Sequence, residues 1–405
     1  MHIFILGAGI AGLTTAYQLS ARGMNVTVIE REPEPAMGAS YANGAQLSVS
    51  NALPMAHPSV FFHLYKSLVK NKGGLFFKLH FSASQWRWIY HFISNCRAAV
   101  AEANLIRIAK MCVRSQELYY QLFEQIDMKF DLSKSGILHF YFDNTAYKIA
   151  QHETALLRQV APQIRTTVDK DKIIEIEPAL KAFSEHIVGG FYSAEDAVGD
   201  ARLFCLELER ICKQRGVEFL YNTRIEDLKL KYRESLIDTS QGDFRADHVV
   251  CCLGVYTPLL LKKIGILLHI YPLKGYSITL ELDDDESQMS APKVSLLDDQ
   301  YKIVASRLGQ RLRIAGIAEL NNYDLELNPQ RIAYLKQWVH RHLPGVSINR
   351  YTSWAGLRPA TPSNLPYVGN AYHKRLWLNS GHGSLGWTAA MATAEAVCNG
   401  ISADL

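Results

Sequence analysis

The chain has 405 residues, a length suited to two or three domains rather than to one simple core. Its formal net charge is +4 and 20% of its residues are charged, which is ordinary for a soluble globular protein and gives no argument for a nucleic-acid partner. The seven cysteines are scattered, odd in number and contain no CxxC, which argues against a secreted disulfide scaffold and fits a reducing compartment. The sequence contains neither an apolar run of transmembrane length nor a metal-ligand spacing, so we expect no metal.

The first thirty residues have the pattern of a nucleotide-binding unit. An apolar strand over His2–Leu6 is followed by Gly7-x-Gly9-x-x-Gly12, a helical pattern and a second strand that ends at Glu30. The three glycines permit the tight turn, the approach of a pyrophosphate and close helix–strand packing. The helix N-terminus attracts phosphate, and the acidic residue is placed for a ribose hydroxyl. The alternative is a glycine-rich turn without a ligand. Because the predicted strand starts at His2, cleavage of an N-terminal segment would destroy this unit, so we expect no signal peptide.

Two segments after this unit leave alternatives open. Residues 39–46 are small residues, amides and hydroxyls, which suit a backbone lying against a flat polar ligand, although surface loops share this composition. The first part of residues 58–126 is rich in aromatic and basic residues, and residues 102–126 have a helical pattern. We interpret the whole segment as an inserted helical cap. Within them, residues 61–92 either form an interfacial membrane patch or pack their aromatics on the rest of the protein.

The remaining elements alternate between strand and helix patterns. Asp200 is a candidate N-cap and Gly216 a helix stop. The predicted strands are 136–142, 187–192, 217–221, 225–230, 235–239, 247–253, 271–282, parts of 301–320, 351–358 and 376–379, and the predicted helices are 145–160, 201–215, 328–342 and 387–400.

A second glycine turn, residues 380–386, opens the last helix and predicts a cofactor that lies along the whole domain. An NAD enzyme needs only the first loop, whereas a flavin also needs contacts to its ring, so FAD fits better. No histidine or cysteine in the loop at Ser40 stands in an obvious position for covalent attachment, so we expect non-covalent FAD. The residues expected to bind it are Ile3, Leu6, Gly7, Ala8, Gly9, Ile10, Ala11, Gly12, Tyr17, Glu30, Arg31, Ser40, Ala42, Asn43, Gly44, Gln46, Ile225, Gly254, Gly381, His382, Gly383, Ser384, Leu385, Gly386 and Thr388.

These elements predict an α/β fold. It combines a Rossmann-type, doubly wound FAD-binding domain with a second antiparallel-sheet substrate domain and a helical cap. We expect the FAD-binding domain to be discontinuous, over residues 1–57, 187–265 and 355–405. The substrate domain would then cover residues 58–186 and 266–354.

Several separated motifs resemble the FAD-dependent D-amino acid oxidase and glycine oxidase family over nearly the whole chain. The versions YPLKGYS and GHGSLGWT point to its dehydrogenase branch. The motifs are GAGIAG at 7–12, ASYANGAQ at 39–46, YPLKGYS at 271–277, YKIVASR at 301–307, RLRIAGIAEL at 311–320, WAGLRPATPSNLPYVG at 354–369 and LWLNSGHGSLGWT at 376–388.

The resemblance implies oxidation of a D-amino acid at Cα, which yields a 2-oxo acid and ammonia. In related amine oxidases the arginine of the GLRP motif binds the substrate carboxylate, and here that residue is Arg358. Only arginine offers the planar fork that a carboxylate prefers, although an arginine could also form a structural ion pair. A tyrosine matching Tyr301 assists it in those relatives, and Tyr276 is a further catalytic candidate.

Other motif residues have weaker assignments. Tyr276 and Lys274 are also ordinary as a strand tyrosine and a buried-stem lysine. Arg313 lies where some relatives place a basic residue near the flavin, and His382 is either catalytic or a backbone cap. Glycine oxidases carry an arginine where this chain has Ser384, which weakens the glycine oxidase alternative.

The favoured function is therefore a D-amino acid dehydrogenase that passes electrons to a quinone or another non-oxygen acceptor. It would be cytoplasmic and peripheral on the cytoplasmic face of the inner membrane, with 61–92 as the contact. The alternatives are an oxygen-using D-amino acid, glycine or cyclic imino acid oxidase on the same scaffold and a nucleotide-binding module without catalytic activity.

Overall fold

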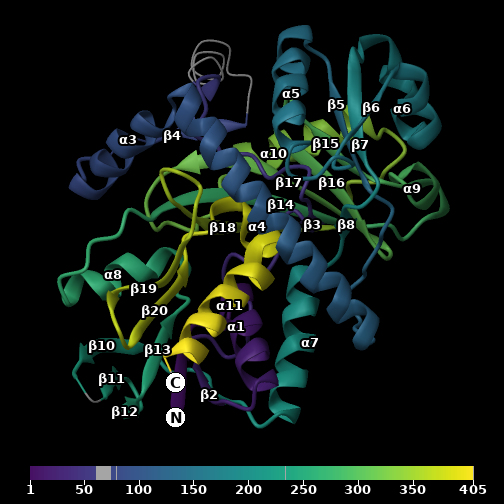
Figure 1. The fold of residues 1–405 in the computed structure, drawn as a ribbon. Helices are drawn as coiled ribbons and strands as arrows, with labels where there is room; N and C mark the ends of the chain where they lie inside the picture. The colour runs from purple at the N-terminus through teal and green to yellow at the C-terminus, as the bar shows by residue number, and fades with distance from the viewer. Residues whose placement is uncertain (61–73, 79, 233, 405) are drawn as a thin grey trace.

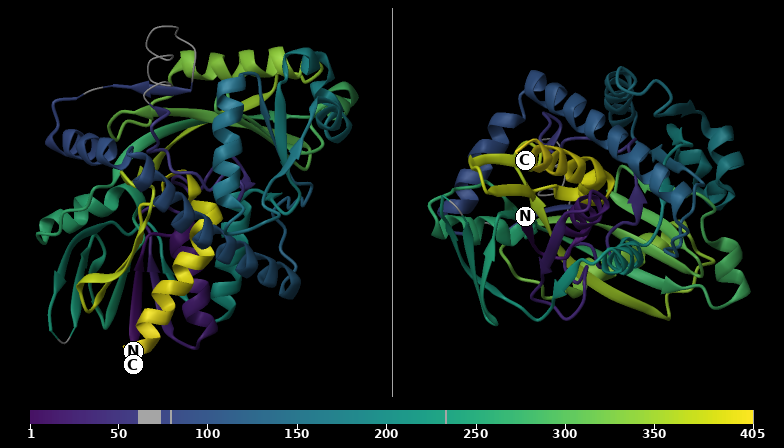
Figure 2. Two further views of the ribbon diagram at one scale, coloured as in Figure 1. Left: turned by 45° about the horizontal axis from the view of Figure 1, so that its top comes forward. Right: turned by 60° about the horizontal axis from the view of Figure 1, so that its bottom comes forward.

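The computed structural model describes residues 1–60, 74–78, 80–232 and 234–404. In Figure 1 one sheet lies beside the two chain ends and a larger sheet lies at the opposite end of the molecule, crossed by long helices. The chain termini lie close together in all the views of Figures 1 and 2. Residues 61–73 and 79 of the expected membrane patch fall outside the described residues.

The sheet near the termini, called here the N-terminal sheet, has the strand order β19–β20–β13–β1–β2–β9. Its neighbouring strands are parallel except for β19, which is antiparallel to β20. This confirms the doubly wound, Rossmann-type arrangement. The strands are β1 (His2–Leu6), β2 (Asn25–Ile29), β9 (Glu218–Leu220), β13 (His248–Cys251), β19 (Tyr367–His373) and β20 (Leu376–Ser380).

Both faces of the N-terminal sheet are covered. Ile3 and Ile5 of β1 belong to a core cluster shared with the helices α1, α7 and α11, whereas Phe4 and Leu6 face the opposite cluster, as strand alternation requires. The first layer comprises α1 (Ile10–Ala21), α4 (Ala98–Gln125), α7 (Ala201–Gln214) and α11 (Gly386–Ala403). The second comprises β10 (Ile225–Leu230), β11 (Ser235–Thr239), β12 (Gly242–Ala246), the 3₁₀ turn η2 (Gly254–Tyr256) and α8 (Thr257–Lys263).

The first helix packs tightly against the turn that precedes it. A Cβ atom placed on Gly12 would lie 1.9 Å from the backbone oxygen of Gly7. No side chain can replace this glycine without moving the helix away from the strand. Its role is therefore packing, as the spacing of the motif predicts.

The large sheet has the order β18–β14–β17–β16–β15–β5–β7–β6, with β4 paired to β17 beyond this path. Its neighbours are antiparallel except for β15 with β5 and β4 with β17. Its strands are β4 (Leu75–Phe77), β5 (Ile137–Tyr141), β6 (Thr166–Val168), β7 (Gly189–Ser193), β14 (Tyr271–Glu281), β15 (Ser295–Asp298), β16 (Ile303–Leu308), β17 (Arg311–Leu320) and β18 (Tyr351–Ala360).

The sheet pairings differ from the expected domain ranges at two places. Residues 187–193 were expected in the FAD-binding domain, but β7 pairs with β5 in the large sheet. Residues 355–360 were also expected there, but β18 pairs with β14 along its whole length. Short strand patterns indicate a strand but do not indicate which sheet will take it.

The other elements connect or cover the two sheets. Helix α10 packs on β14 and β17, and Asn328 caps it by accepting a hydrogen bond from the Gln330 N–H at 2.9 Å. These elements are β3 (Gln46–Leu47), β8 (Ala197–Val198), α3 (Ala83–Asn95), α5 (Asn144–Leu157), α6 (Lys170–Ile176), η1 (Pro178–His186), α9 (Asp285–Ser290), α10 (Pro329–His342) and η3 (Gly383–Leu385). No helix formed by the described residues is both long and apolar enough to span a bilayer.

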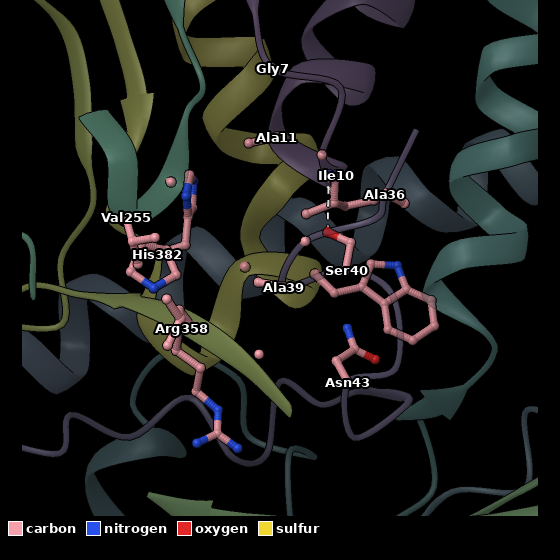
Figure 3. A pocket seen from close by; sticks show the side chains of 18 of the residues that line it. Gly7, Ile10, Ala11, Ala36, Ala39, Ser40, Asn43, Val255, Arg358 and His382 are labelled. Carbon is pink, nitrogen blue, oxygen red and sulfur yellow. Dashed lines mark hydrogen bonds between the residues drawn. The ribbon is translucent and has the colours of Figure 1, made fainter. Parts of the chain in front are cut away.

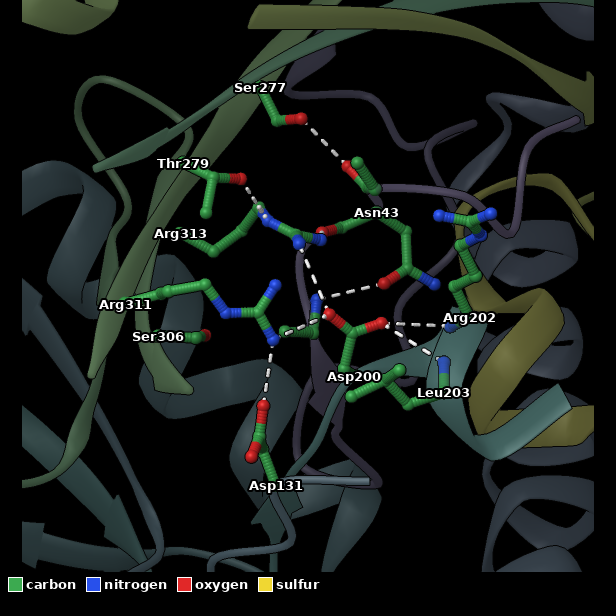
Figure 4. Close-up of polar contacts among 12 residues, drawn as sticks. Asn43, Asp131, Asp200, Arg202, Leu203, Ser277, Thr279, Ser306, Arg311 and Arg313 are labelled. Carbon is green, nitrogen blue, oxygen red and sulfur yellow. Dashed lines mark hydrogen bonds and ion pairs between the residues drawn. The ribbon is translucent and has the colours of Figure 1, made fainter. Parts of the chain in front are cut away.

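A buried ionic network joins the two sheets (Figure 4). Asp200 caps α7 through Oδ1, while its Oδ2 lies 3.3 Å from guanidinium nitrogens of both Arg311 and Arg313 on β17. Arg313 also donates to the Asn43 backbone oxygen at 3.2 Å. Burial lowers the pKa of Arg313, and Asp200 opposes that change. The network fixes the 42–44 loop between α7 and the large sheet.

Replacing the buried arginine of this network should destabilise the fold. Arg313→Met leaves Asp200 with one partner in a site from which water is excluded, so we expect the free energy of unfolding to fall by about 3 kcal/mol. Arg311→Met is the matched control. The Arg311 and Asp131 side chains are each about one-third exposed to solvent, so the free energy of unfolding should fall by less than about 1 kcal/mol. Urea unfolding measures both, and equal losses would contradict the assignment.

Candidate active site

A cavity of about 700 Å³ lies where the two sheets meet. The carboxyl ends of β1, β2 and β13 form one wall, as the position of ligand sites in open α/β sheets leads one to expect. Residues of β14, β17 and β18 form the opposite wall. Figure 3 shows Gly7 and Ile10 at one side of this space, and the Arg358 side chain extending from its strand away from them.

Most of the residues predicted to bind the cofactor line this cavity. They come from six separate stretches of sequence that only the fold brings together. The lining includes Gly7, Gly9, Ile10, Ala11, Glu30, Arg31, Ser40, Ala42, Asn43, Gly44, Gln46, Ile225, Gly254, His382, Gly383, Ser384, Leu385, Gly386 and Thr388.

Six predicted cofactor residues do not line the cavity. Ile3 and Leu6 point into the two cores that flank β1. Tyr17 packs under Arg215, whose guanidinium lies 4.5 Å from the centre of its ring. The other three are Ala8, Gly12 and Gly381. Five of these residues lie in or next to β1 and α1, and Gly381 follows β20, so they support the site from behind instead of lining it.

The first turn is held by Glu30 and Ser40. Glu30 Oε2 accepts a hydrogen bond from the Ala8 N–H at 2.7 Å, and Ser40 Oγ accepts one from the Ile10 N–H at 3.2 Å (Figure 3). Residues at the beginnings of both α1 and α11 line the cavity. Helix N-termini favour negatively charged groups, so this cavity is suited to a phosphate-bearing cofactor with an extended shape.

Buried polar atoms without partners test whether FAD fits here. The Oδ1 atom of Asn379 and the Nε1 atom of Trp387 are buried without a hydrogen-bond partner among the described residues, and both residues line the cavity. Such atoms are costly unless a ligand satisfies them. Together with the volume and the two helix N-termini, they fit a flavin dinucleotide. No group of three or more His, Cys, Asp or Glu residues in the described part of the chain is placed to hold a metal ion.

Arg358 is the main charged group in the predicted substrate region. It lines the cavity, and its NH1 donates to the Ile317 backbone oxygen at 2.8 Å. Desolvation lowers its pKa to about 10, so it stays charged at neutral pH. Across the described residues no carboxylate forms an ion pair with it. A desolvated cation without an anion is costly, which makes Arg358 a carboxylate-binding candidate.

Local backbone irregularity positions this arginine. The register between β14 and β17 shifts opposite Gly275, and Ile317 in that bulge has φ 62°, which is rare for a β-branched residue. A Cβ atom on Gly275 would lie 2.5 Å from the guanidinium carbon of Arg358. The glycine thus leaves room for the guanidinium, and the bulge directs a carbonyl towards it.

The two candidate tyrosines lie in different places relative to the cavity. Tyr301 lies outside the cavity lining, and its hydroxyl accepts a hydrogen bond from Arg341 at 2.8 Å on the α10 side. Tyr276 is at the cavity wall, but its ring packs with Ile278 in the core beneath α10. Burial raises its pKa, and its hydroxyl has no partner among the described atoms. Tyr276 therefore stays a candidate at the cavity wall, whereas Tyr301 lies apart from the lining.

Two further predicted residues have structural contacts. His382 lines the cavity, and its Nε2 lies 3.0 Å from Thr393 Oγ1 on α11. Burial lowers its pKa to about 4, so it is neutral at pH 7. Arg313 is not in the cavity lining and supports the Asn43 loop from behind.

Sequence reasoning missed several lining residues, including Val255, Leu325 and Trp354. Trp354 is the first residue of the motif at 354–369 on β18, and its place two residues before GLRP could have indicated that it lines the site. Leu325 lies in a loop without motif or periodicity, so no sequence pattern indicated that it lines the cavity.

Comparisons with known proteins agree with this geometry. The profile of the family "FAD dependent oxidoreductase" matches residues 2–399. A D-amino acid dehydrogenase of Dechloromonas aromatica (strain RCB) is 41% identical, with 99% of this chain and 97% of that protein covered. One from Neisseria meningitidis serogroup A is 34% identical, over 99% and 96%.

Solved structures extend the likeness to the fold. Glycine oxidase from Bacillus cereus ATCC 14579 superimposes with a TM-score of 0.74 at 18% identity, covering 100% of this chain and 95% of that one. L-proline dehydrogenase from P. horikoshii gives 0.74 at 18% identity, with 100% and 93% covered.

The buried neutral His382 should make stability depend on pH. An unfolded histidine binds a proton near pH 6.5, but His382 resists protonation until about pH 4. Between these values the unfolded state binds more protons, so stability falls as the pH falls. Between pH 7.5 and 5.0, wild type should lose about 2 kcal/mol more than His382→Asn. Urea unfolding at both pH values measures this, and identical losses would contradict it.

Proposed function

The chain belongs to the FAD dependent oxidoreductase family, and from this membership we propose that it oxidatively deaminates D-amino acids to 2-oxo acids and ammonia. The observation that carries the proposal is Arg358, a half-buried, desolvated guanidinium in the cavity without a carboxylate partner among the described residues. The 34–41% identical relatives named D-amino acid dehydrogenase support the substrate class.

In this proposal Arg358 binds the carboxylate of the amino acid. The Ile317 carbonyl holds one guanidinium nitrogen, which leaves the other N–H groups for a bidentate contact. The same contact would orient Cα towards the cofactor and exclude water from the charge pair. A bound FAD would supply the hydride acceptor for the Cα hydrogen, and water would hydrolyse the resulting imino acid to the 2-oxo acid and ammonia.

Loss of the guanidinium should abolish turnover while sparing the cofactor. We expect anaerobic D-alanine or D-proline to bleach the flavin absorbance of wild type, and L-amino acids to do so far more slowly. Arg358→Met should retain FAD but lose about 10²–10⁴-fold in kcat/KM, the scale of about 3–5 kcal/mol for removing one partner of a desolvated charge pair. Stopped-flow absorbance gives both results.

Arg358→Lys is the matched control, because it keeps the positive charge but lacks the planar guanidinium. It should recover only part of the lost activity, because an ammonium makes no planar bidentate contact. If wild type bleaches with no amine at all, the proposal fails and a cofactor-binding module is favoured. If Arg358→Met retains full activity, the carboxylate is bound elsewhere.

We further propose that electrons pass to a quinone at a membrane surface, with α3 as the contact. Trp86, Tyr90 and Ile93 are 50%, 71% and 50% exposed and lie on one face of α3 at helical spacing. The opposite face packs as a cap, because Trp88 and Phe92 belong to a buried cluster beside β14. Exposed aromatics on an amphipathic helix suit a lipid interface. Within the described part of 61–92, the two faces of α3 therefore support both interpretations.

Vesicle binding tests the proposed surface. Wild type should co-sediment with vesicles of phosphatidylethanolamine and phosphatidylglycerol. The double variant Trp86→Ser/Tyr90→Ser should bind roughly tenfold more weakly, because it lacks the two aromatic rings that would insert into the lipid interface. Tyr232→Ser is the control, since Tyr232 is 78% exposed but lies away from α3. Equal binding by all variants contradicts the surface. Stoichiometric hydrogen peroxide without quinone reduction would instead favour an oxygen-using oxidase.

A further inference from the structure

The segment 321–328 connects β17 to α10 and makes contacts with both halves of the molecule. Tyr323 donates its hydroxyl hydrogen to the Val255 backbone oxygen at 3.2 Å, and its ring lies 5.8 Å from that of Tyr256. Val255 and Tyr256 belong to η2 beside the N-terminal sheet, and both line the cavity. The segment, called here the 321–328 strap, therefore bridges the two walls of the site.

Lys274 of β14 holds the middle of the strap. Its Nζ donates to the Glu326 backbone oxygen at 2.5 Å and lies 3.4 Å from Asp324 Oδ2. The side chain is only 2% exposed, and an ammonium is rarely buried without a specific partner. The adjacent residue, Gly275, is the one that makes room for Arg358. Along β14, Lys274 thus stands one residue before the glycine beside the proposed carboxylate-binding arginine.

The strap also has a defined internal shape. Asn322 Oδ1 accepts a hydrogen bond from the Asp324 N–H at 2.9 Å, and Asp324 Oδ1 accepts one from the Glu326 N–H at 2.7 Å. Such turns fix the backbone locally. They leave the side chain of the intervening Leu325 at a fixed point of the strap.

Leu325 is a large apolar side chain that is both exposed and part of the cavity lining. It is 48% exposed, so it stands where the cavity meets solvent. Leu327, two residues later, is 43% exposed but does not line the cavity. The chain therefore contains two leucines of similar exposure on one segment, of which one faces the site.

We propose that Leu325 forms the rim through which the substrate side chain enters, and that Lys274 is the positioning residue that keeps the strap there. This rests on the proposed amino acid oxidation. The rim limits the size of the amino acid side chain by contact with Leu325, and it shields the cofactor from small solutes in solvent. Lys274 acts through the strap and touches neither substrate nor cofactor.

Steady-state kinetics with a small and a large substrate test the rim. Leu325→Ala should raise kcat/KM for D-phenylalanine relative to D-alanine by about tenfold, mainly through KM, because a pocket contact of this size carries discrimination of that order. Leu327→Ala should leave the ratio within about twofold, since it removes similar exposed surface away from the site. The same ratio in both variants would overturn the proposal.

A second measurement needs no turnover. Iodide quenching of flavin fluorescence should increase at least about twofold in Leu325→Ala and in Lys274→Met, with an unchanged FAD dissociation constant. Lys274→Met keeps the length of the buried side chain and removes only the charge, so the fold should persist. Unchanged quenching in both variants would refute the rim. If wild type oxidised no amino acid but quenching rose as stated, the proposed function would fail while the rim stood. A weakened FAD affinity in Leu325→Ala would overturn the assignment to substrate.

Discussion

The guanidinium of Arg358 sits in a desolvated position with the neutral carbonyl of Ile317 as its hydrogen-bond partner. Desolvating a cation is unfavourable, and the surrounding structure has to supply that free energy. Gly275 leaves room for the guanidinium, and a bulge in which Ile317 adopts a left-handed backbone conformation directs a carbonyl towards it. The arginine is therefore prepared for an anion that the described part of the chain does not provide.

The cavity exists because two differently built sheets are locked together. The N-terminal sheet contributes turns and helix N-termini that favour phosphates, whereas the large sheet contributes Arg358 and a wall of small residues. The Asp200–Arg313 pair, together with hydrogen bonds from Ser277 to Ala42 and from Ser306 to Gly44, fixes the loop between them. Ionic and polar contacts at this junction hold the loop in a single position against both sheets.

Local patterns predicted the elements well, because glycine turns, caps and apolar alternation act over a few residues. The unit from β1 to Glu30, the cap at Asp200 and the helix α10 agree with the structure. The position of a residue in a motif did not show where its side chain points. Tyr301 and Tyr276 stand in motif segments, yet one contacts Arg341 and the other packs in the core beneath α10. Neighbours across a sheet decide which way such a side chain can point.

The sequence by itself determined the nucleotide-binding unit, because that unit depends on residue types at fixed short spacing. The resemblance of several separated motifs to a known family indicated the family and the arginine expected to hold a carboxylate. Only the tertiary structure decided which strands join the large sheet, that Arg358 lacks a carboxylate partner among the described residues, and that Leu325 reaches the cavity. The reason is physical. Strand pairing, burial and the approach of residues far apart in the chain depend on packing of the whole fold, which no local pattern records.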